Sequence, residues 1–217
     1  MATKKAAQQV EVTIKPPKFG STTVTIVGVA PLVINAFSAK AREQMRQKQE
    51  AGSVGRKGKQ REPKDFHAAY EAAMHLSREG WHGIPAAAFR NAMISACRIV
   101  GFKMTLAKLS LFVHADGYDV VDGTPLVRIT KGEPKYVEHP VRNESGVADI
   151  RPRPMWAEGW EARVSLRWDE DQFTASDLLN LMARVGLQVG IGEGRPDSKN
   201  SAGMGWGLFE IKRGAHA

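Results

Sequence analysis

Hydrophobic and polar residues alternate in two segments of this chain, and this alternation is typical of half-buried β-strands. Residues 22–29 (TTVTIVGV) are rich in β-branched side chains. Residues 161–168 place Ala, Val, Leu and Trp on one side, with Arg163, Ser165 and Arg167 on the other. Because successive strand residues point to opposite faces of a sheet, we expect the apolar set to line a core and the arginine side to face away from it.

Two further segments show helical periodicity. Residues 85–100 begin with a proline, which suits the first helical turn, and repeat apolar side chains at helical spacing up to Gly101. Thr174 is a favourable N-cap for a second helix, which Gly186 is predicted to end. Weaker patterns predict a helix over 66–76, an apolar segment over 32–37, and strands over 108–114, 187–191 and 207–212.

The strongest elements follow the order strand, helix, strand, strand, helix, strand. This order predicts an α+β protein with a ferredoxin-like (RRM-like) βαββαβ core in one domain, residues 1–217. Two helices would cover one sheet face and leave the other open, as in RNA-recognition modules. We expect a basic arm over 38–66, an insertion over 115–160 with a hairpin around 126–129 and 135–139, and a glycine-rich hairpin over 186–210.

Positive charge is concentrated in the first third of the chain. The net charge is +8, and residues 1–66 hold 13 Lys and Arg against 5 Asp and Glu. The arm has almost no apolar side chains, so it cannot bury enough surface to order itself. We interpret it as a mobile segment that attracts phosphates, although a solvated linker is the alternative. Its candidate nucleic-acid contacts are Lys40, Arg42, Arg46, Arg56, Lys57, Lys59 and Arg61.

Several classes of protein are disfavoured by composition. A lone cysteine, Cys97, can form no internal disulfide and offers no cysteine pair for zinc. The first residues lack the apolar stretch of a signal peptide, and no run is long enough to span a bilayer. We therefore expect a soluble, cytoplasmic protein that needs no metal and no cofactor and does not bind membranes.

The segment 186–210 is the strongest candidate for a binding site. Its glycines lack side chains, so a polymer backbone can approach and backbone N–H groups can face phosphates. The alternative is a hairpin whose glycines only permit close packing. The glycines follow a helix, whereas a dinucleotide fingerprint places them before one, and the near match at 52–60 fails the P-loop spacing. The candidate contacts are Gly190, Gly192, Gly194, Arg195 and Lys199.

Other cations and one aromatic residue complete the predicted interface. Arg151, Arg153 and Trp156 lie in a proline-rich segment (RPRPMW), where the tryptophan either stacks on bases or plugs the edge of the core. Lys103 either faces the open sheet together with Arg163 and Arg167 or is an ordinary solvated loop lysine.

Signals for catalysis are weak. His67, Glu71 and His75 fall at i, i+4 and i+8, but the two histidines would lie two helical turns apart, so a solvent-facing helix surface is the simpler interpretation. His82 is a possible general base without an evident acid partner. We predict that the protein is not an enzyme.

Three segments together resemble the RAMP superfamily, and more narrowly the backbone-type subunits of CRISPR effector complexes and small tailed-phage proteins. They are the ending VGIGEGRP…GMGWGLFEI, the opening strand with its Pro-Leu step (27–32), and the helix GIPAAAFRNAMISACR. The resemblance covers about two thirds of the chain. It implies a ferredoxin-like core that holds single-stranded RNA between a glycine-rich loop and a hairpin "thumb", for which 115–160 is the candidate.

The leading hypothesis is a protein that binds single-stranded RNA or DNA through its backbone, with little dependence on sequence. Because a head-to-tail contact repeats without closing, we expect self-association into a filament along the strand. Two alternatives remain open. One is a metal-independent RAMP-type endoribonuclease with His82 or His67 as base, and the other is a phage protein that engages or mimics host CRISPR machinery.

Overall fold

The computed structural model describes residues 15–37, Glu43, Gln47, 65–142, 148–198 and 203–212. Its strands are β1 (Phe19–Gly28), β2 (Leu32–Val33), β3 (Gly83–Pro85), β4 (Leu111–His114), β5 (Gly117–Tyr118), β6 (Pro125–Lys131), β7 (Pro134–Arg142), β8 (Ala148–Trp156), β9 (Glu161–Asp169) and β10 (Phe209–Ile211). Its helices are α2 (Phe66–Glu71), α3 (Ala86–Ile99), α4 (Met104–Ser110), α5 (Ala175–Arg184) and the π-helical turn η1 (Val185–Val189). The fold is therefore α+β, as predicted.

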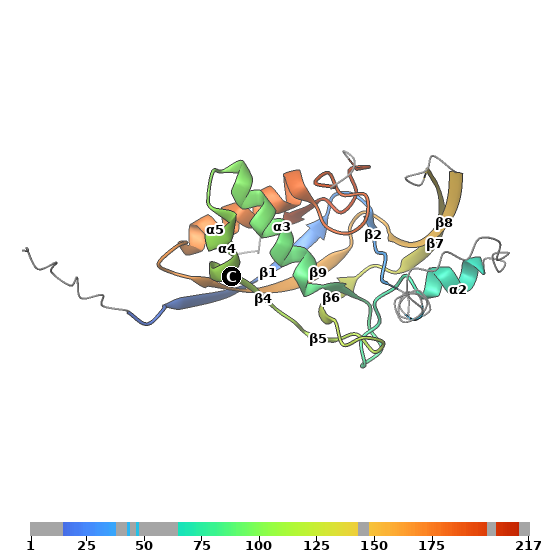
Figure 1. Cartoon of the computed structure of the whole chain (residues 1–217), viewed down its shortest axis with the longest axis horizontal. Coiled ribbons are helices and arrows are strands. Elements are labelled where there is room, and N and C mark those ends of the chain that lie inside the picture. Colours follow the sequence, from blue (N-terminus) through green and yellow to red (C-terminus); the bar gives the residue numbers. More distant parts are fainter. Residues whose placement is uncertain are drawn as a thin grey trace, which may run out of the picture.

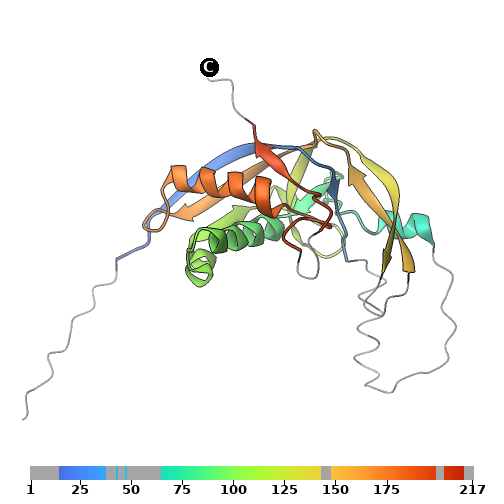
Figure 2. The same cartoon turned by 90° about the horizontal axis from the view of Figure 1, so that it is seen from above.

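Two antiparallel sheets organise these elements (Figure 1). The larger has the order β10-β1-β9-β6-β3, with β4 also paired to β9 and β5 to β6. β1 and β9 form its long central pair, in register from Phe19 opposite Asp169 to Val27 opposite Glu161. The smaller sheet has the order β2-β8-β7, and the long β7–β8 hairpin stands away from the larger sheet (Figure 2).

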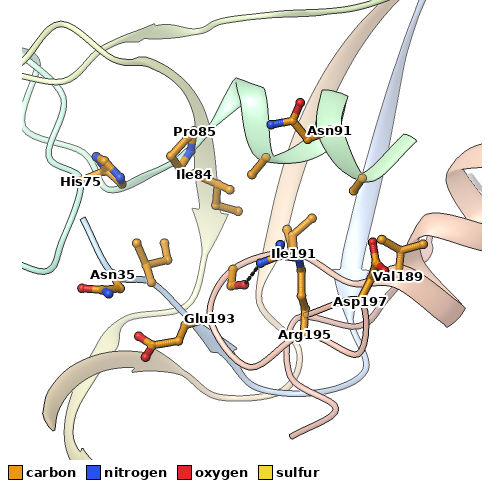
Figure 3. Close-up of a pocket in the computed structure, with 14 residues that line it drawn as sticks. Asn35, His75, Ile84, Pro85, Asn91, Val189, Ile191, Glu193, Arg195 and Asp197 are labelled. Atoms are coloured by element: carbon orange, nitrogen blue, oxygen red, sulfur yellow. Dashed lines mark hydrogen bonds between the residues drawn. The ribbon is translucent and has the colours of Figure 1, made fainter. Parts of the chain in front are cut away.

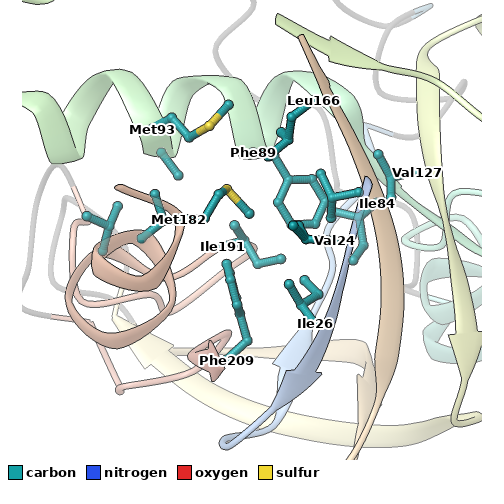
Figure 4. Packing of buried hydrophobic residues seen from close by; sticks show 14 of the residues in the cluster. Val24, Ile26, Ile84, Phe89, Met93, Val127, Leu166, Met182, Ile191 and Phe209 are labelled. Atoms are coloured by element: carbon teal, nitrogen blue, oxygen red, sulfur yellow. The ribbon is translucent and has the colours of Figure 1, made fainter. Parts of the chain in front are cut away.

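The core lies between one face of the larger sheet and the helices α3 and α5 (Figure 4). β9 alternates as its sequence predicts, with Ala162, Val164, Leu166 and Trp168 buried. Phe89 of α3 meets Phe209 of β10 at 6.3 Å between ring centroids. Because the helices cover this face alone, side chains on the opposite face of β1 and β9, such as Arg163, are left exposed (Figure 2).

The helix α5 begins with the predicted cap but ends later than predicted. The Thr174 hydroxyl accepts from the Asp177 N–H, and the Asp177 carboxylate accepts from the Thr174 N–H, which is a complete capping box. The helix then continues into η1 and stops at Gly190, where φ is +71°. The predicted end at Gly186 and the strand over 187–191 are therefore wrong: residues 186–189 belong to η1, and among the described residues of 190–210 the one regular element is β10, which begins at Phe209. A Cβ on Gly186 would lie 2.1 Å from the carbonyl oxygen of Phe209, so this glycine serves to bring η1 against β10.

The predicted strands at 126–129 and 135–139 exist but do not pair with each other. The first belongs to β6, which pairs with β3, β5 and β9. The second belongs to β7, which pairs with β8 over nine residues, from Pro134 opposite Trp156 to Arg142 opposite Ala148. Among the described residues of 115–160, β5 and β6 thus belong to the larger sheet, and the β7–β8 hairpin stands away from it.

Candidate nucleic-acid interface

The glycine-rich loop, which comprises the described residues 190–198 and 203–208 between η1 and β10, is hydrogen-bonded to the segment that follows β1. The Glu193 N–H donates to the Val33 carbonyl at 2.9 Å, and the Gly207 N–H donates to the Pro31 carbonyl at 2.8 Å. The two ends of the loop are joined because the Ile191 N–H donates to the Gly207 carbonyl at 3.1 Å. These bonds hold two segments, more than 150 residues apart in the chain, side by side.

Two of the glycines are required by close backbone contact. A Cβ on Gly192 would lie 2.4 Å from the Val33 oxygen, and one on Gly207 would lie 1.8 Å from the Ile191 oxygen. Both also have positive φ, +77° and +69°, which favours glycine. The alternative that the glycines permit close packing therefore describes these positions well. Among the described residues, the N–H groups of Gly194 and Arg195 donate to no partner, and both residues are half-buried.

A groove of about 610 Å³ lies between this loop and the first half of α3 (Figure 3). Its walls include Asn35, His75, Asn91, Arg195 and Asp197. α3 enters the groove with an uncapped end, since its N-cap is a proline without a side-chain hydrogen bond and its first turn carries no acid. The first turn is Ala-Ala-Ala, so its N–H groups can be approached closely.

The acidic side chains of the loop are offset by arginines. Glu193 forms an ion pair with Arg153 of β8. Asp197 pairs with Arg98 of α3 at 3.0 Å and also accepts from the Ser95 hydroxyl. Arg195 donates to the Gly192 carbonyl at 2.9 Å and makes no ion pair with any described carboxylate. Of the three, Arg195 is therefore the one cation at the groove without an ion-pair partner among the described residues.

The β7–β8 hairpin holds its predicted binding residues in unequal positions. Trp156 is fully buried, with its ring 5.8 Å from that of His82, which favours the alternative that it plugs the edge of the core over the alternative that it stacks on bases. Arg153 is mostly buried and committed to Glu193. Arg151 is half-exposed and lies 3.5 Å from the Asp149 carboxylate.

The uncovered face of the larger sheet carries the two arginines predicted for it. Arg163 and Arg167 are exposed, and neither forms an ion pair with any described residue. The Arg167 guanidinium lies over the Phe19 ring, 4.0 Å from its centroid, a cation–π contact. Lys103 does not join them. It is the N-cap of α4, in the α3–α4 connection on the helix-covered side of the sheet (Figure 1).

The remaining predicted contacts lie outside the described residues: Lys40, Arg42, Arg46, Arg56, Lys57, Lys59, Arg61 and Lys199. Their role stays a prediction from composition.

The histidines differ most from expectation. α2 ends at Glu71, so the predicted helical row of His67, Glu71 and His75 does not form. His75 is buried, and its Nδ1 lies 2.7 Å from the carboxylate of the buried Asp119. Sequence reasoning missed this pair because 44 residues separate its members, and no spacing rule connects them.

Two further contacts near the groove were not predicted. Trp206 of the loop lies against His139 of the hairpin, with 4.7 Å between ring centroids. The Nδ1 of His82 is buried without a hydrogen-bond partner, and burial lowers the pKa of this histidine, partly opposed by the charge of Glu133. In the described part of the chain, no three His, Cys, Asp or Glu residues are grouped to hold a metal ion, and no helix has the length and apolar character to cross a bilayer.

Comparison with known proteins identifies the fold alone. No protein-family model and no curated protein matches the sequence. Among solved structures, the chain is similar to one from a cryo-EM structure of the Type III-B Cmr-beta complex bound to cognate target RNA, with 10% sequence identity and a TM-score of 0.52. The match covers 90% of this chain and 60% of that chain, so this chain spans about three fifths of the length of its structural neighbour.

Proposed function

We propose that this protein binds single-stranded nucleic acid, RNA or DNA, through the sugar-phosphate backbone at the groove between α3 and the glycine-rich loop. The observation that carries this proposal is the convergence of backbone donors and one cation. The uncapped first turn of α3 begins at this groove, which Pro85 and Ala88 line, and Arg195 lines it from the glycine-rich loop. Phosphate oxygens accept from such donors without reading bases, so binding should depend little on sequence.

The fold supports a more specific relationship. β1, α3, β4, β9, α5 and β10 follow in the order strand, helix, strand, strand, helix, strand, and their sheet order is β10-β1-β9-β4. We propose that this is a ferredoxin-like core of the RAMP type, with the β7–β8 hairpin as its thumb. The similarity to a chain of an RNA-bound Cmr-beta complex favours a role related to CRISPR effector subunits, or to phage proteins of the same descent.

Other surfaces would assist the groove. The exposed Arg163 and Arg167 offer a second contact to the strand, and the basic arm over 38–66 adds sequence-independent attraction by counterion release. Head-to-tail contacts between copies would carry the strand from one groove to the next and produce a filament.

A fluorescence-anisotropy titration tests the proposal. Labelled homopolymers of RNA and DNA should bind with similar affinity, and duplexes of the same length should bind less well. The affinity should fall steeply between low and moderate salt, because each neutralised phosphate returns a counterion to solution. Absence of binding to all single strands at low salt would refute the proposal. If binding occurs, digestion of the strand recovered with the native protein by RNase or DNase identifies the polymer.

We propose binding without cleavage, and one observation favours the alternative. His67 and His82 do not line the groove, but His75 does, and a buried carboxylate orients it. An endoribonuclease that uses this histidine as a base would cut RNA in the presence of EDTA, and His75→Ala would abolish the cut. Intact RNA after long incubation with the wild-type protein would support binding alone.

A further inference from the structure

The structure has an exposed apolar patch beside β5, which we name the tip patch: Leu76, Tyr118, Val120 and Val121. Residues 76–78 and 118–120 run antiparallel, since the Val120 N–H donates to the Leu76 carbonyl at 2.9 Å and the Arg78 N–H to the Tyr118 carbonyl at 3.1 Å. The residues between them, Ser77 and Asp119, are buried. Strand alternation therefore turns Leu76, Tyr118 and Val120 outward. Val121 follows in a turn, and Val120 and Val121 are 57% and 60% exposed.

A second apolar patch lies where α3 joins α4, and we name it the corner patch: Ile99, Val100, Met104 and Leu109. α4 buries Ala107 and Ser110 against the protein, so Met104 and Leu109 are left on its outer face. Leu109 is 72% exposed. α4 lies towards one end of the larger sheet and β5 towards the other, so the two patches are well separated (Figure 1).

The two patches differ in the charge that surrounds them. Residues 92–115 contain three cations, Arg98, Lys103 and Lys108, and no acid, but Arg98 is paired with Asp197, so Lys103 and Lys108 set the charge of this patch. Lys103 and Lys108 are exposed, and they form no ion pair in the described part of the chain. The segments that carry the tip patch, 76–82 and 115–124, expose Glu79, Asp116 and Asp122 against Arg78. The exposed Arg128 of β6 also lies there, with its guanidinium over the Trp81 ring, so three acids stand against two arginines. The patches are thus both apolar and opposite in charge at their rims.

We infer that the tip patch of one copy docks on the corner patch of the next. Exposed apolar patches with polar rims are typical of protein interfaces, and opposite rim charges favour this pairing over tip with tip or corner with corner. Because the two patches lie towards different ends of the molecule, the contact is heterologous and leaves a free patch at each end of every assembly. The inference rests on the proposed filament, for which it names the two contact surfaces.

Paired variants test the arrangement. Val120→Glu/Val121→Glu places two carboxylates in the tip patch, and Met104→Glu/Leu109→Glu places two in the corner patch. All four side chains are exposed, so both proteins should fold, and thermal unfolding checks this. Leu187→Glu, at a position 56% exposed and in neither patch, is the matched control.

Self-association is measured on nucleic-acid-free protein by light scattering during size-exclusion chromatography, over a wide range of concentration. The wild-type and Leu187→Glu proteins should form a concentration-dependent series of oligomers, and each patch variant should associate at least about tenfold more weakly. In a mixture of the two variants, the variant with a changed corner patch supplies an intact tip patch, and the variant with a changed tip patch supplies an intact corner patch. It should therefore form a dimer of one tip variant with one corner variant, and grow no further.

Three results would overturn the inference: a monomeric wild-type protein at all concentrations, patch variants that associate like the wild type, or a mixture that stays monomeric. Binding of each monomeric variant to an oligonucleotide long enough for one subunit is measured separately. Retained binding with no tip-to-corner association rejects this inference and leaves the proposed function intact. Lost strand binding with intact tip-to-corner association rejects the proposed function and leaves the contact between the two patches intact.

Discussion

Two arginine-bearing surfaces of this molecule differ in what their arginines contact. On the uncovered sheet face, Arg163 and Arg167 are exposed and meet no described carboxylate. Beside the groove, Arg98 and Arg153 neutralise Asp197 and Glu193, and of the three Arg195 alone has no ion-pair partner among the described residues. The sheet face therefore has more free charge, whereas the groove has more fixed shape and more oriented backbone donors.

The number of cations on a surface therefore does not by itself identify the nucleic-acid-binding site. A surface arginine in high dielectric contributes little unless its position is fixed, since ordering a long side chain costs entropy. The groove residues are held by loop hydrogen bonds and ion pairs before any ligand arrives, so less ordering is left to do on binding. We expect the groove to dominate affinity and the sheet face to assist it.

The largest effect should come from disturbing Gly207, which packs against Ile191 in the wall of the groove. Gly207→Ala combines a positive φ of +69° with a Cβ only 1.8 Å from the Ile191 oxygen. We expect a loss of unfolding free energy on the order of 3–5 kcal/mol, measured by urea unfolding, and loss of strand binding. Gly205→Ala is the control, because φ there is +75° but nothing lies within 4 Å of the added Cβ, so it should cost only about 1–2 kcal/mol. Equal losses in both variants would show that the close contact is unimportant.

The second-largest effect should distinguish the groove from the sheet face as the principal binding surface. Arg195→Ala should weaken strand binding roughly tenfold and reduce the salt slope by about 0.7, the amount expected for one phosphate contact on a single strand. Arg195→Lys should retain most of that slope. The double variant Arg163→Ala/Arg167→Ala should weaken binding only about threefold, as rim charges do. A larger loss in the double variant than in Arg195→Ala would make the sheet face the principal site.

A gain of binding is expected when the acid beside the groove is removed. Glu193→Gln releases the guanidinium of Arg153 from its ion pair, so affinity for a labelled single strand should rise roughly threefold by anisotropy. The double variant Arg153→Ala/Glu193→Gln tests whether the gain in affinity comes from Arg153. Because the two residues are in contact, the effects of the two substitutions on binding should not be additive. If the double variant binds as tightly as Glu193→Gln, the gain does not come from Arg153.

The sequence predicts the sheet face much better than the groove. Alternation over 161–168 placed Arg163 and Arg167 on the exposed side, because period two follows from strand geometry alone. The capping box at Thr174 was likewise a local signal. The groove depends instead on contacts between distant segments, such as Glu193 with Arg153 and His75 with Asp119, which no local period encodes.

The glycine-rich segment shows why a correct motif led to a wrong local structure. Glycine permits several backbone conformations, so its spacing alone does not distinguish a strand from a helical turn with a left-handed exit. Close contact between Gly186 and Phe209 decided in favour of η1, and that contact appears only when α5 packs beside β10. Trp156 was ambiguous for a similar reason, since burial of its ring depends on the segment around His82.

The smallest expected effect concerns His82, whose contact with Trp156 joins the larger sheet to the base of the β7–β8 hairpin. Burial lowers the pKa of His82, so the folded protein takes up the proton less readily than the unfolded chain. The unfolded state then binds more protons as the pH falls below about 6.5, and the stability that neutral His82 contributes at neutral pH is lost. We expect the melting temperature of the wild type to fall on the order of 1–2 °C more than that of His82→Phe between about pH 7.5 and about pH 5. Because this junction orients the hairpin and not the open sheet face, acid should also weaken groove binding more in the wild type than in His82→Phe. Identical pH profiles for the two proteins would show that His82 does not couple the sheets.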